Sequence, residues 1–210
     1  MAKERLKSPR ARLFVALDLP ASVLAGLVAW QGEALGDPAL RAVAPEALHV
    51  TLCFLAYHPE RDIERIAEVI TGIEARPTEL RLAPEPVPIP KNRPRLFALG
   101  AEGEGAVALQ AELSDRLQAK RFYEPEKRPF WSHVTVARVK PARRTSSERR
   151  ARRRGRSMPV SRPPKALPGE LLEAFSAVRV TLYQSLLRPT GAEYVSLAEL
   201  DLPPAKAEKR

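Results

Sequence analysis

The hydrophobic pattern along the chain changes repeatedly between the period of a β-strand and the period of an α-helix. Seven segments are short, apolar and rich in β-branched or aromatic residues, or alternate apolar with polar positions, which is typical of β-strands. They span residues 12–18, 48–55, 78–82, 95–99, 131–139, 177–185 and 193–200. The sequence therefore predicts seven strands.

Three other segments repeat apolar residues at the spacing of one helix face. The first covers residues 21–35, ends before Gly36-Asp37-Pro38, and has an apolar stripe of Val23, Leu24, Leu27, Val28 and Leu35. The second begins at Pro59, with a stripe of Ile63, Ile66, Ala67, Ile70 and Ile73. The third spans about residues 105–119, with Leu109, Leu113 and Leu117 on one side.

Short strands that alternate with helices in this way are typical of an α+β protein. The order strand, helix, strand, helix comes first, and strand, helix, strand recurs after a proline-rich connector at residues 84–90. This recurrence indicates a duplicated unit. We expect one domain over residues 12–202, between a basic flexible tail at residues 1–11 and a flexible tail at residues 203–210.

Composition limits the class of protein. The chain has 210 residues, of which 44% are hydrophobic, as is ordinary for a soluble globular domain. Its single cysteine, Cys53, excludes an intramolecular disulfide and a cage of several thiolates around zinc. The apolar run behind the basic start is shorter than a secretory signal requires, and no stretch has the length of a membrane span. We therefore expect a cytoplasmic protein.

Positive charge is concentrated in one region. The formal net charge is +10, and residues 138–165 hold twelve Lys or Arg against one acid, Glu148. We interpret residues 141–168 as a basic insertion that is a mobile loop, or a helix that forms only on a partner. It is either an arm that binds RNA phosphates without reading sequence or a solvated insertion without a role.

Candidate chemistry comes from a repeated tetrapeptide pattern. His49-Val50-Thr51-Leu52 and His133-Val134-Thr135-Val136 each lie in a predicted strand, where alternation turns the histidine and its threonine to the same face. Two imidazoles can take a proton from water and give one to a leaving oxygen near neutral pH. The pattern therefore favours acid-base chemistry on a phosphate, with threonine hydroxyls on its oxygens.

Less specific interpretations exist for each of these residues. A single His-x-Thr on a strand is usually a structural histidine, but two copies in a chain with three histidines argue against chance. The third histidine, His58, is not part of a His-x-Thr motif, and we interpret it as a residue at the start of the helix that begins at Pro59. A zinc site made of all three is conceivable, but no carboxylate or thiolate accompanies them at ligand spacing, so we expect chemistry without a metal.

The two motifs resemble those of the two-histidine (2H) phosphoesterases, and in particular the RNA 2′,3′-cyclic phosphodiesterases, formerly called 2′-5′ RNA ligases. Residues 12–20 resemble the opening strand of that family, residues 93–100 its central strand, and residues 180–186 with 191–194 its closing hairpin. The resemblance implies a bilobal fold: two pseudo-symmetric lobes of antiparallel sheet, flanked by helices, with the histidines in a central cleft. Residues 141–168 depart from the family pattern.

The resemblance also implies roles for particular residues. His49 would be the proton donor and His133 the proton acceptor, although the residues alone do not decide which is which. Thr51, Thr135 and Arg138 would bind the cyclic phosphate. Strict alternation from His133 turns Arg138 to the opposite face, so a bulge or the end of the strand must redirect it. The aromatic residues near the cleft either stack on a base or belong to the core: Phe14, Phe54, Tyr57, Phe130 and Trp131.

The expected activity is hydrolysis of RNA 2′,3′-cyclic phosphate ends to a 2′-phosphomonoester, with 2′-5′ ligation as a minor reverse reaction. We expect no cofactor, no metal, no membrane association and a monomer. One alternative is the same chemistry on the cyclic phosphate of a small nucleotide or an ADP-ribose derivative. Another is an RNA-binding module without catalysis. This alternative is disfavoured because both motifs are intact, with His49, Thr51, His133 and Thr135. The chain contains no P-loop, Rossmann glycine pattern or Gly-x-Ser-x-Gly.

Overall fold

The computed structural model describes residues 9–142, 157–188 and 191–205. The strands within these residues are β1 Arg10–Asp18, β2 Leu40–Ala42, β3 His49–Pro59, β4 Glu79–Leu82, β5 Val87–Ile89, β6 Leu96–Glu102, β7 His133–Val139, β8 Phe175–Ser176, β9 Arg179–Arg188 and β10 Gly191–Asp201. The helices are α1 Ala21–Ala34, α2 Ile63–Thr71 and α3 Glu104–Ala119, with short 3-10 turns at Pro45–Ala47, Glu60–Asp62 and Gly169–Leu172.

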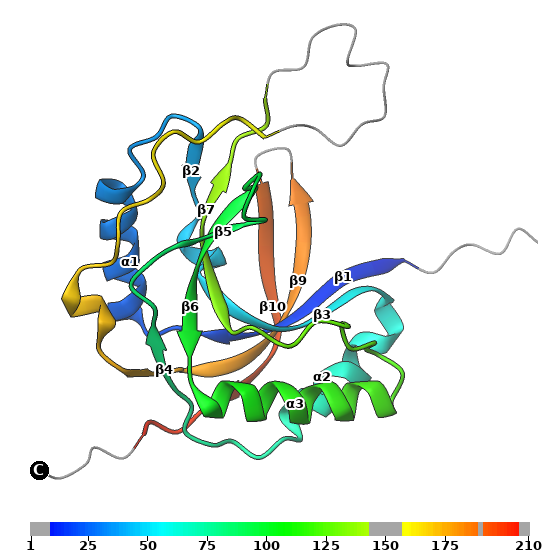
Figure 1. Ribbon diagram of the computed structural model, residues 1–210. Helices are drawn as coiled ribbons and strands as arrows, with labels where there is room; N and C mark the ends of the chain where they lie inside the picture. The colour runs from blue at the N-terminus through cyan, green and yellow to red at the C-terminus, as the bar shows by residue number, and fades with distance from the viewer. Residues whose placement is uncertain (1–8, 143–156, 189–190, 206–210) are drawn as a thin grey trace, which may run out of the picture.

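All strand pairs are antiparallel, and the strands follow the order β10-β9-β1-β3-β7-β6-β4-β8, with β2 added to β7 and β5 to β6 (Figure 1). Helix α1 lies on one side of the molecule, while α2 and α3 lie together on the other. The predicted α+β class with an antiparallel sheet flanked by helices is confirmed. None of the helices in the described ranges is long and apolar enough to cross a bilayer.

The two His strands are neighbours at the centre of this order. Strands β3 and β7 run antiparallel, and Val50 lies opposite Val134. Each of these valines is buried and stands between the histidine and threonine of its own motif. A rotation of half a turn about the midpoint between the two valines therefore relates the two motifs, which agrees with the pseudo-twofold relationship predicted for them.

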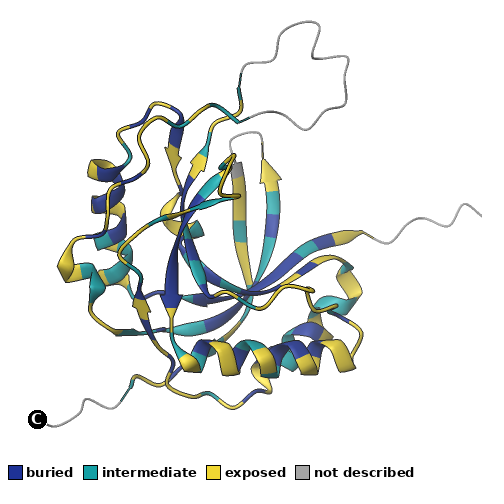
Figure 2. Ribbon diagram, in the orientation of Figure 1, coloured by how far each residue is buried: buried dark blue, intermediate teal, exposed yellow. Residues whose placement is uncertain are grey.

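The buried faces of the helices agree only in part with the predicted stripes (Figure 2). In α3 the predicted side chains Leu109, Leu113 and Leu117 are buried, as expected. In α1 the prediction for Val28 is wrong, because Val28 is 40% exposed while Trp30 and Gln31 are buried. Gln31 tolerates burial because its Nε2 donates hydrogen bonds to the carbonyl oxygens of Val43 and Val136, at 3.1 and 2.7 Å.

Some predicted loops contain regular or fixed structure. The connector at residues 84–90 contains β5, an edge strand in which Pro88 is tolerated. Residues 157–168 differ from the expected mobile insertion, because Asp37 accepts hydrogen bonds from the backbone N–H groups of Ser161 and Arg162, both at 2.8 Å. Trp30 also donates to the carbonyl oxygen of Ala166 at 3.1 Å. The remaining basic residues of the proposed arm, at 143–156, lie outside the described residues.

The ends of the expected domain also shift slightly. Strand β1 begins at Arg10, inside the predicted tail of residues 1–11, because β1 pairs with β3 as far as Arg10 opposite Pro59. At the other end, the backbone N–H of Ala205 donates to Oγ of Ser176 at 3.0 Å. Residues 1–8 and 206–210 of the predicted tails lie outside the described residues.

Candidate active site

The four side chains of the repeated motif line one pocket of about 160 Å³. His49 and Thr51 come from β3, and His133 and Thr135 come from β7. Strand alternation turns these four to the open face of the sheet while Val50 and Val134 pack into the core. The complete lining is Arg12, Phe14, Val43, Ala47, His49, Thr51, Phe54, His133, Thr135, Arg138 and Tyr194. None of these lining residues is acidic, so the pocket suits an anion.

A β-bulge turns Arg138 into the pocket. In the pairing of β6 with β7, Ala98 lies opposite Thr135 and Phe97 opposite Ala137, so Val136 has no partner. One extra residue restores the side-chain face of His133 and Thr135 at Arg138. The structure thus contains the irregularity that the resemblance required.

A second bulge stands at the matching position of β3. Val15 lies opposite Cys53 and Ala16 opposite Thr51, which leaves Leu52 without a partner. As a result Phe54 faces the pocket with Thr51, and 41% of Phe54 is exposed. The guanidinium of Arg12 lies 4.6 Å from the centre of the Phe54 ring, a distance typical of a cation–π contact.

His133 is oriented by Trp131. The two rings are stacked, with centroids 4.5 Å apart and planes inclined by 17°. Nδ1 of His133 lies 2.7 Å from the carbonyl oxygen of Trp131. A carbonyl oxygen can only accept, so Nδ1 carries a proton and Nε2 is the nitrogen available to a ligand.

His49 sits among aromatic rings. Phe14 and Tyr183 are stacked with it at centroid distances of 5.1 and 6.0 Å, and the edge of Tyr194 approaches to 5.5 Å. Its Nδ1 is buried and lacks a hydrogen-bond partner among the described residues. Burial lowers the pKa of His49 to about 4, with smaller contributions from the positive charges of Arg138 and His133, against the raising effect of the Glu46 backbone. His49 is therefore neutral at pH 7 in the free protein.

Sequence reasoning missed three residues that shape the surroundings of His49: Arg12, Tyr183 and Tyr194. Arg12 lines the pocket, and its Nη1 donates to Oγ of Ser185 at 2.9 Å. Tyr183 donates to Asp18 at 2.9 Å, and burial raises the pKa of both of these groups. Arg12 could have been found, because it precedes Phe14 by two positions in a predicted strand and so shares its face. The tyrosines could not, because their contact with His49 depends on strand order.

The third histidine does not join the other two. Nε2 of His58 donates to the carbonyl oxygen of Leu55 at 2.9 Å, and its ring meets Phe122 edge-on at 6.1 Å. No group of three or more His, Cys, Asp or Glu side chains within the described ranges could hold a metal ion. Of the aromatic candidates, Phe14 and Phe54 line the pocket, whereas Phe130 and Trp131 line a different one; Tyr57 lines neither.

Comparisons with known proteins identify relatives of this chain. No family model matches the chain. An RNA 2′,3′-cyclic phosphodiesterase of Thermus thermophilus is 30% identical over 205 residues, covering 91% of this chain and 90% of the relative. An enzyme of the same name from Archaeoglobus fulgidus is 31% identical over 134 residues, covering 61% of this chain and 73% of the relative.

Solved structures show the same fold. A Thermus thermophilus protein superimposes with a TM-score of 0.73 at 26% identity, covering 92% of this chain and 98% of that one. Escherichia coli LigT in its apo form gives a TM-score of 0.69 at 25% identity, covering 93% and 99%. The extent of the sequence match, on a shared fold, shows that this chain belongs to the RNA 2′,3′-cyclic phosphodiesterase family of 2H phosphoesterases.

Proposed function

We propose that this protein hydrolyses the 2′,3′-cyclic phosphate at the end of an RNA to a 2′-phosphomonoester, using His49 and His133 as an acid-base pair. The observation that carries this proposal is the meeting of both His-x-Thr pairs and Arg138 in one pocket without an acidic lining residue. The curated relatives carry the name of this activity. Membership of the family makes a cyclic phosphodiester the first substrate to test.

The proposed reaction needs few groups. Water attacks phosphorus in line with the 3′ oxygen, one imidazole takes the proton of the water, and the other gives a proton to the departing 3′ oxygen. The hydroxyls of Thr51 and Thr135 and the guanidinium of Arg138 donate hydrogen bonds to the non-bridging oxygens. Each proton transfer contributes about 10²–10⁴-fold to the rate. No step in this scheme requires a metal or a cofactor.

As the proton donor, His49 must be protonated when substrate is bound. The family resemblance assigns proton donation to His49 and proton abstraction to His133. Because the pKa of His49 is lowered to about 4, a donor His49 must take up its proton as the anionic phosphate enters the pocket. The negative charge of the substrate favours that uptake by stabilising the imidazolium.

A substrate with sulfur in place of the 3′ bridging oxygen tests this division. A thiolate leaves without being protonated, so the variant that lacks the donor should regain most of its rate on that substrate, whereas the variant that lacks the base should not. We expect His49→Ala to be rescued. Rescue of His133→Ala instead would reverse the two roles and leave the acid-base pair intact.

Other parts of the proposal concern the setting of the reaction. We propose a monomer that acts without membrane contact, in which the adjacent strands β3 and β7 supply both histidines, both threonines and Arg138. We place it in the cytoplasm, where the buried thiol of Cys53 would stay reduced. Ligation of RNA ends through a 2′-5′ linkage is the reverse of the same proton transfers and would be a minor activity.

The decisive variants are His49→Ala and His133→Ala, with His58→Ala as a matched control outside the pocket. Each variant would be assayed for hydrolysis of a short RNA ending in 2′,3′-cyclic phosphate. We expect each pocket variant to lose at least about 10²-fold in kcat while His58→Ala stays within a few-fold of wild type. Binding of this RNA by wild type without cleavage would favour the RNA-binding module. Cleavage only of mononucleoside cyclic phosphates would favour a small-nucleotide substrate.

A further inference from the structure

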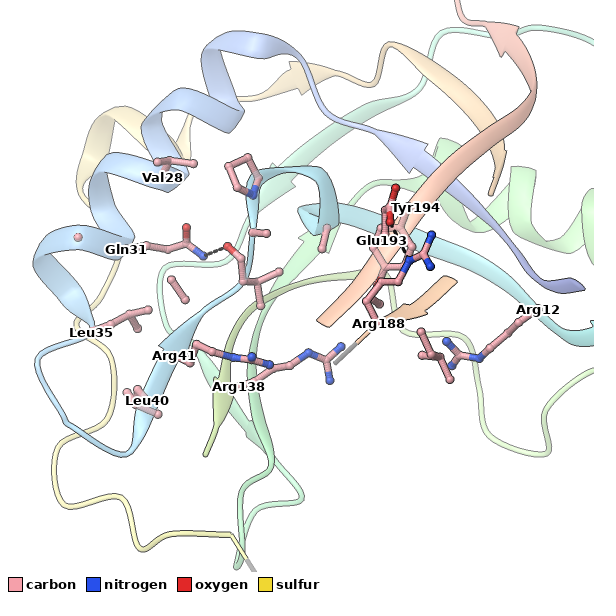
Figure 3. Close-up of a pocket in the computed structure, with 18 residues that line it drawn as sticks. Arg12, Val28, Gln31, Leu35, Leu40, Arg41, Arg138, Arg188, Glu193 and Tyr194 are labelled. Atoms are coloured by element: carbon pink, nitrogen blue, oxygen red, sulfur yellow. Dashed lines mark hydrogen bonds and ion pairs between the residues drawn. The ribbon is translucent and has the colours of Figure 1, made fainter. Parts of the chain in front are cut away.

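The site pocket opens into a much larger groove. This groove, of about 1200 Å³, shares Arg12, Val43, Ala47, Arg138 and Tyr194 with the site pocket, whose volume is about 160 Å³. One wall comes from α1, β2 and the turn before β3, and the other from the hairpin of β9 and β10 (Figure 3). The groove has room for far more than a terminal cyclic phosphate.

The most unusual feature of the groove is a pair of facing arginines. Arg41 on β2 lies directly opposite Arg138 on β7, and both side chains are exposed and line the groove. Figure 3 shows the two side chains extending in the same direction. Among the described residues, neither guanidinium forms an ion pair. Like charges directly opposite each other on neighbouring strands destabilise a sheet, and an anion bound beside them offsets that cost.

The opposite wall of the groove is less positive. Arg188 is paired with Glu193 at 3.1 Å, and Glu193 is the acidic residue among those that line the groove. Arg12 also lines the groove without an ion pair among the described residues, but its guanidinium contacts the Phe54 ring and donates to Ser185. Arg41 and Arg138 therefore form the positive pair that faces the groove. Apolar side chains of Val28, Leu35 and Leu40 line the same side as this pair, where they can contact the face of a base or a ribose.

We propose that Arg41 binds the phosphodiester that precedes the terminal nucleotide, so that the groove holds the RNA strand on the 5′ side of the cyclic phosphate. This inference rests on the proposed function, in which Arg138 binds the cyclic phosphate itself. Successive phosphates of one strand then meet two neighbouring guanidiniums. The site distinguishes an RNA end from a mononucleoside cyclic phosphate, which has no such phosphodiester.

Two substrates separate a contact with the preceding phosphodiester from a general effect of Arg41 on activity. A mononucleoside 2′,3′-cyclic phosphate offers only the cyclic phosphate, whereas a dinucleotide ending in the same group adds the preceding phosphodiester. For Arg41→Gln we expect kcat/KM on the dinucleotide to fall about 10- to 100-fold, the range for a hydrogen bond between charged groups. On the mononucleoside substrate kcat/KM should stay unchanged. Arg81→Gln is the matched control, because Arg81 is exposed on β4 and lines neither the groove nor the site pocket.

An equal fall on both substrates, or no fall on either, would overturn the proposal. Unfolding of the variant would not explain a decrease in kcat/KM that is confined to the dinucleotide. The unfolding temperature of Arg41→Gln should be no lower than that of wild type, because the change removes a repulsion between like charges.

A binding measurement keeps the proposal testable if wild type hydrolyses neither substrate, a result that would refute the proposed function. The probe is a short fluorescent RNA with a 3′-phosphate, titrated with wild type and Arg41→Gln at several salt concentrations. Loss of one phosphate contact should weaken binding and reduce the slope of log K against log salt by about 0.7. An unchanged affinity and slope would contradict a phosphate contact at Arg41, whatever the activity of the protein.

Discussion

Phe54 and Arg138 occupy equivalent positions on the two His strands. Each follows its motif threonine by three positions, and each is turned into the pocket by a bulge at the residue after that threonine. The pseudo-twofold relationship of β3 and β7 therefore extends beyond the histidines to these two side chains. It places an aromatic ring and a guanidinium at matching positions around one site, which suits a ligand with both a base and a phosphate.

The exposed ring of Phe54 predicts a contribution to substrate binding. Phe54→Ala should raise KM for an RNA cyclic phosphate about 5- to 100-fold, since stacking of a base on an aromatic ring contributes about 1–3 kcal/mol. The value of kcat should change little, because Phe54 has no proton to transfer. Steady-state kinetics with Phe54→Trp as the conservative control would check this. A fall in kcat at constant KM would contradict a stacking role.

The two threonines can be tested without disturbing the strands. Thr51→Val and Thr135→Val retain a β-branched side chain and replace the hydroxyl with a methyl group. Each should lower kcat/KM about 10- to 100-fold, because a hydrogen bond to a charged oxygen contributes about 1.5–3 kcal/mol. Thr71→Val, on the exposed end of α2, is the matched control. Full activity of both pocket variants would exclude the threonines from phosphate binding.

Trp131 should act as a positioning residue for His133. Loss of the stacked indole in Trp131→Ala leaves the His133 ring held only by its backbone hydrogen bond. We expect kcat to fall about 3- to 10-fold, in line with about 0.5–1.5 kcal/mol for an aromatic pair, with KM unchanged. Trp131→Phe should recover most of the loss. Nitrogen NMR of His133 gives a second readout, because Trp131→Ala retains the backbone carbonyl at this position and should keep the tautomer protonated on Nδ1, so that a lower kcat would report a misplaced ring.

The lowered pKa of His49 links stability to pH. In the unfolded chain His49 protonates near pH 6.5, whereas in the folded protein its pKa is about 4. Between these values the unfolded state binds the extra proton, so stability is lost as pH falls from about 6.5 to 4. The loss from this group should be about 2–3 kcal/mol.

Denaturant unfolding of wild type and His49→Phe between pH 4 and 7 would measure this contribution. The variant places an apolar ring among Phe14, Tyr183 and Tyr194 and cannot titrate at this position. We expect its unfolding free energy to fall less over this range than that of wild type. Parallel curves for the two proteins would show that His49 has an ordinary pKa in the fold.

The sequence predicted much of the site because short-range patterns determine it. Strand alternation around Val50 and Val134 was enough to place each histidine with its threonine, and helical spacing identified the buried face of α3. What could not be predicted depends on long-range pairing. Arg41 is a functional candidate only because the three-residue strand β2 pairs with β7, and a short edge strand has too few residues to show a periodicity.

The same limit explains the error in α1. A helix stripe is assigned from apolar residues, but Gln31 is buried because two backbone carbonyl oxygens from distant segments satisfy its amide. The buried face of α1 therefore includes Gln31 and leaves Val28 exposed. Buried polar groups of this kind are determined by their partners in the fold, which the local sequence does not reveal.

The position of the phosphate in the product is the most direct test of the central claim. Wild type would be incubated with a short RNA ending in 2′,3′-cyclic phosphate in excess chelator, and the product would be analysed by phosphorus NMR. The account predicts a 2′-phosphomonoester formed at the same rate with and without chelator, because His49 and His133 supply both proton transfers. A 3′-phosphomonoester, or hydrolysis that chelator abolishes, would contradict it.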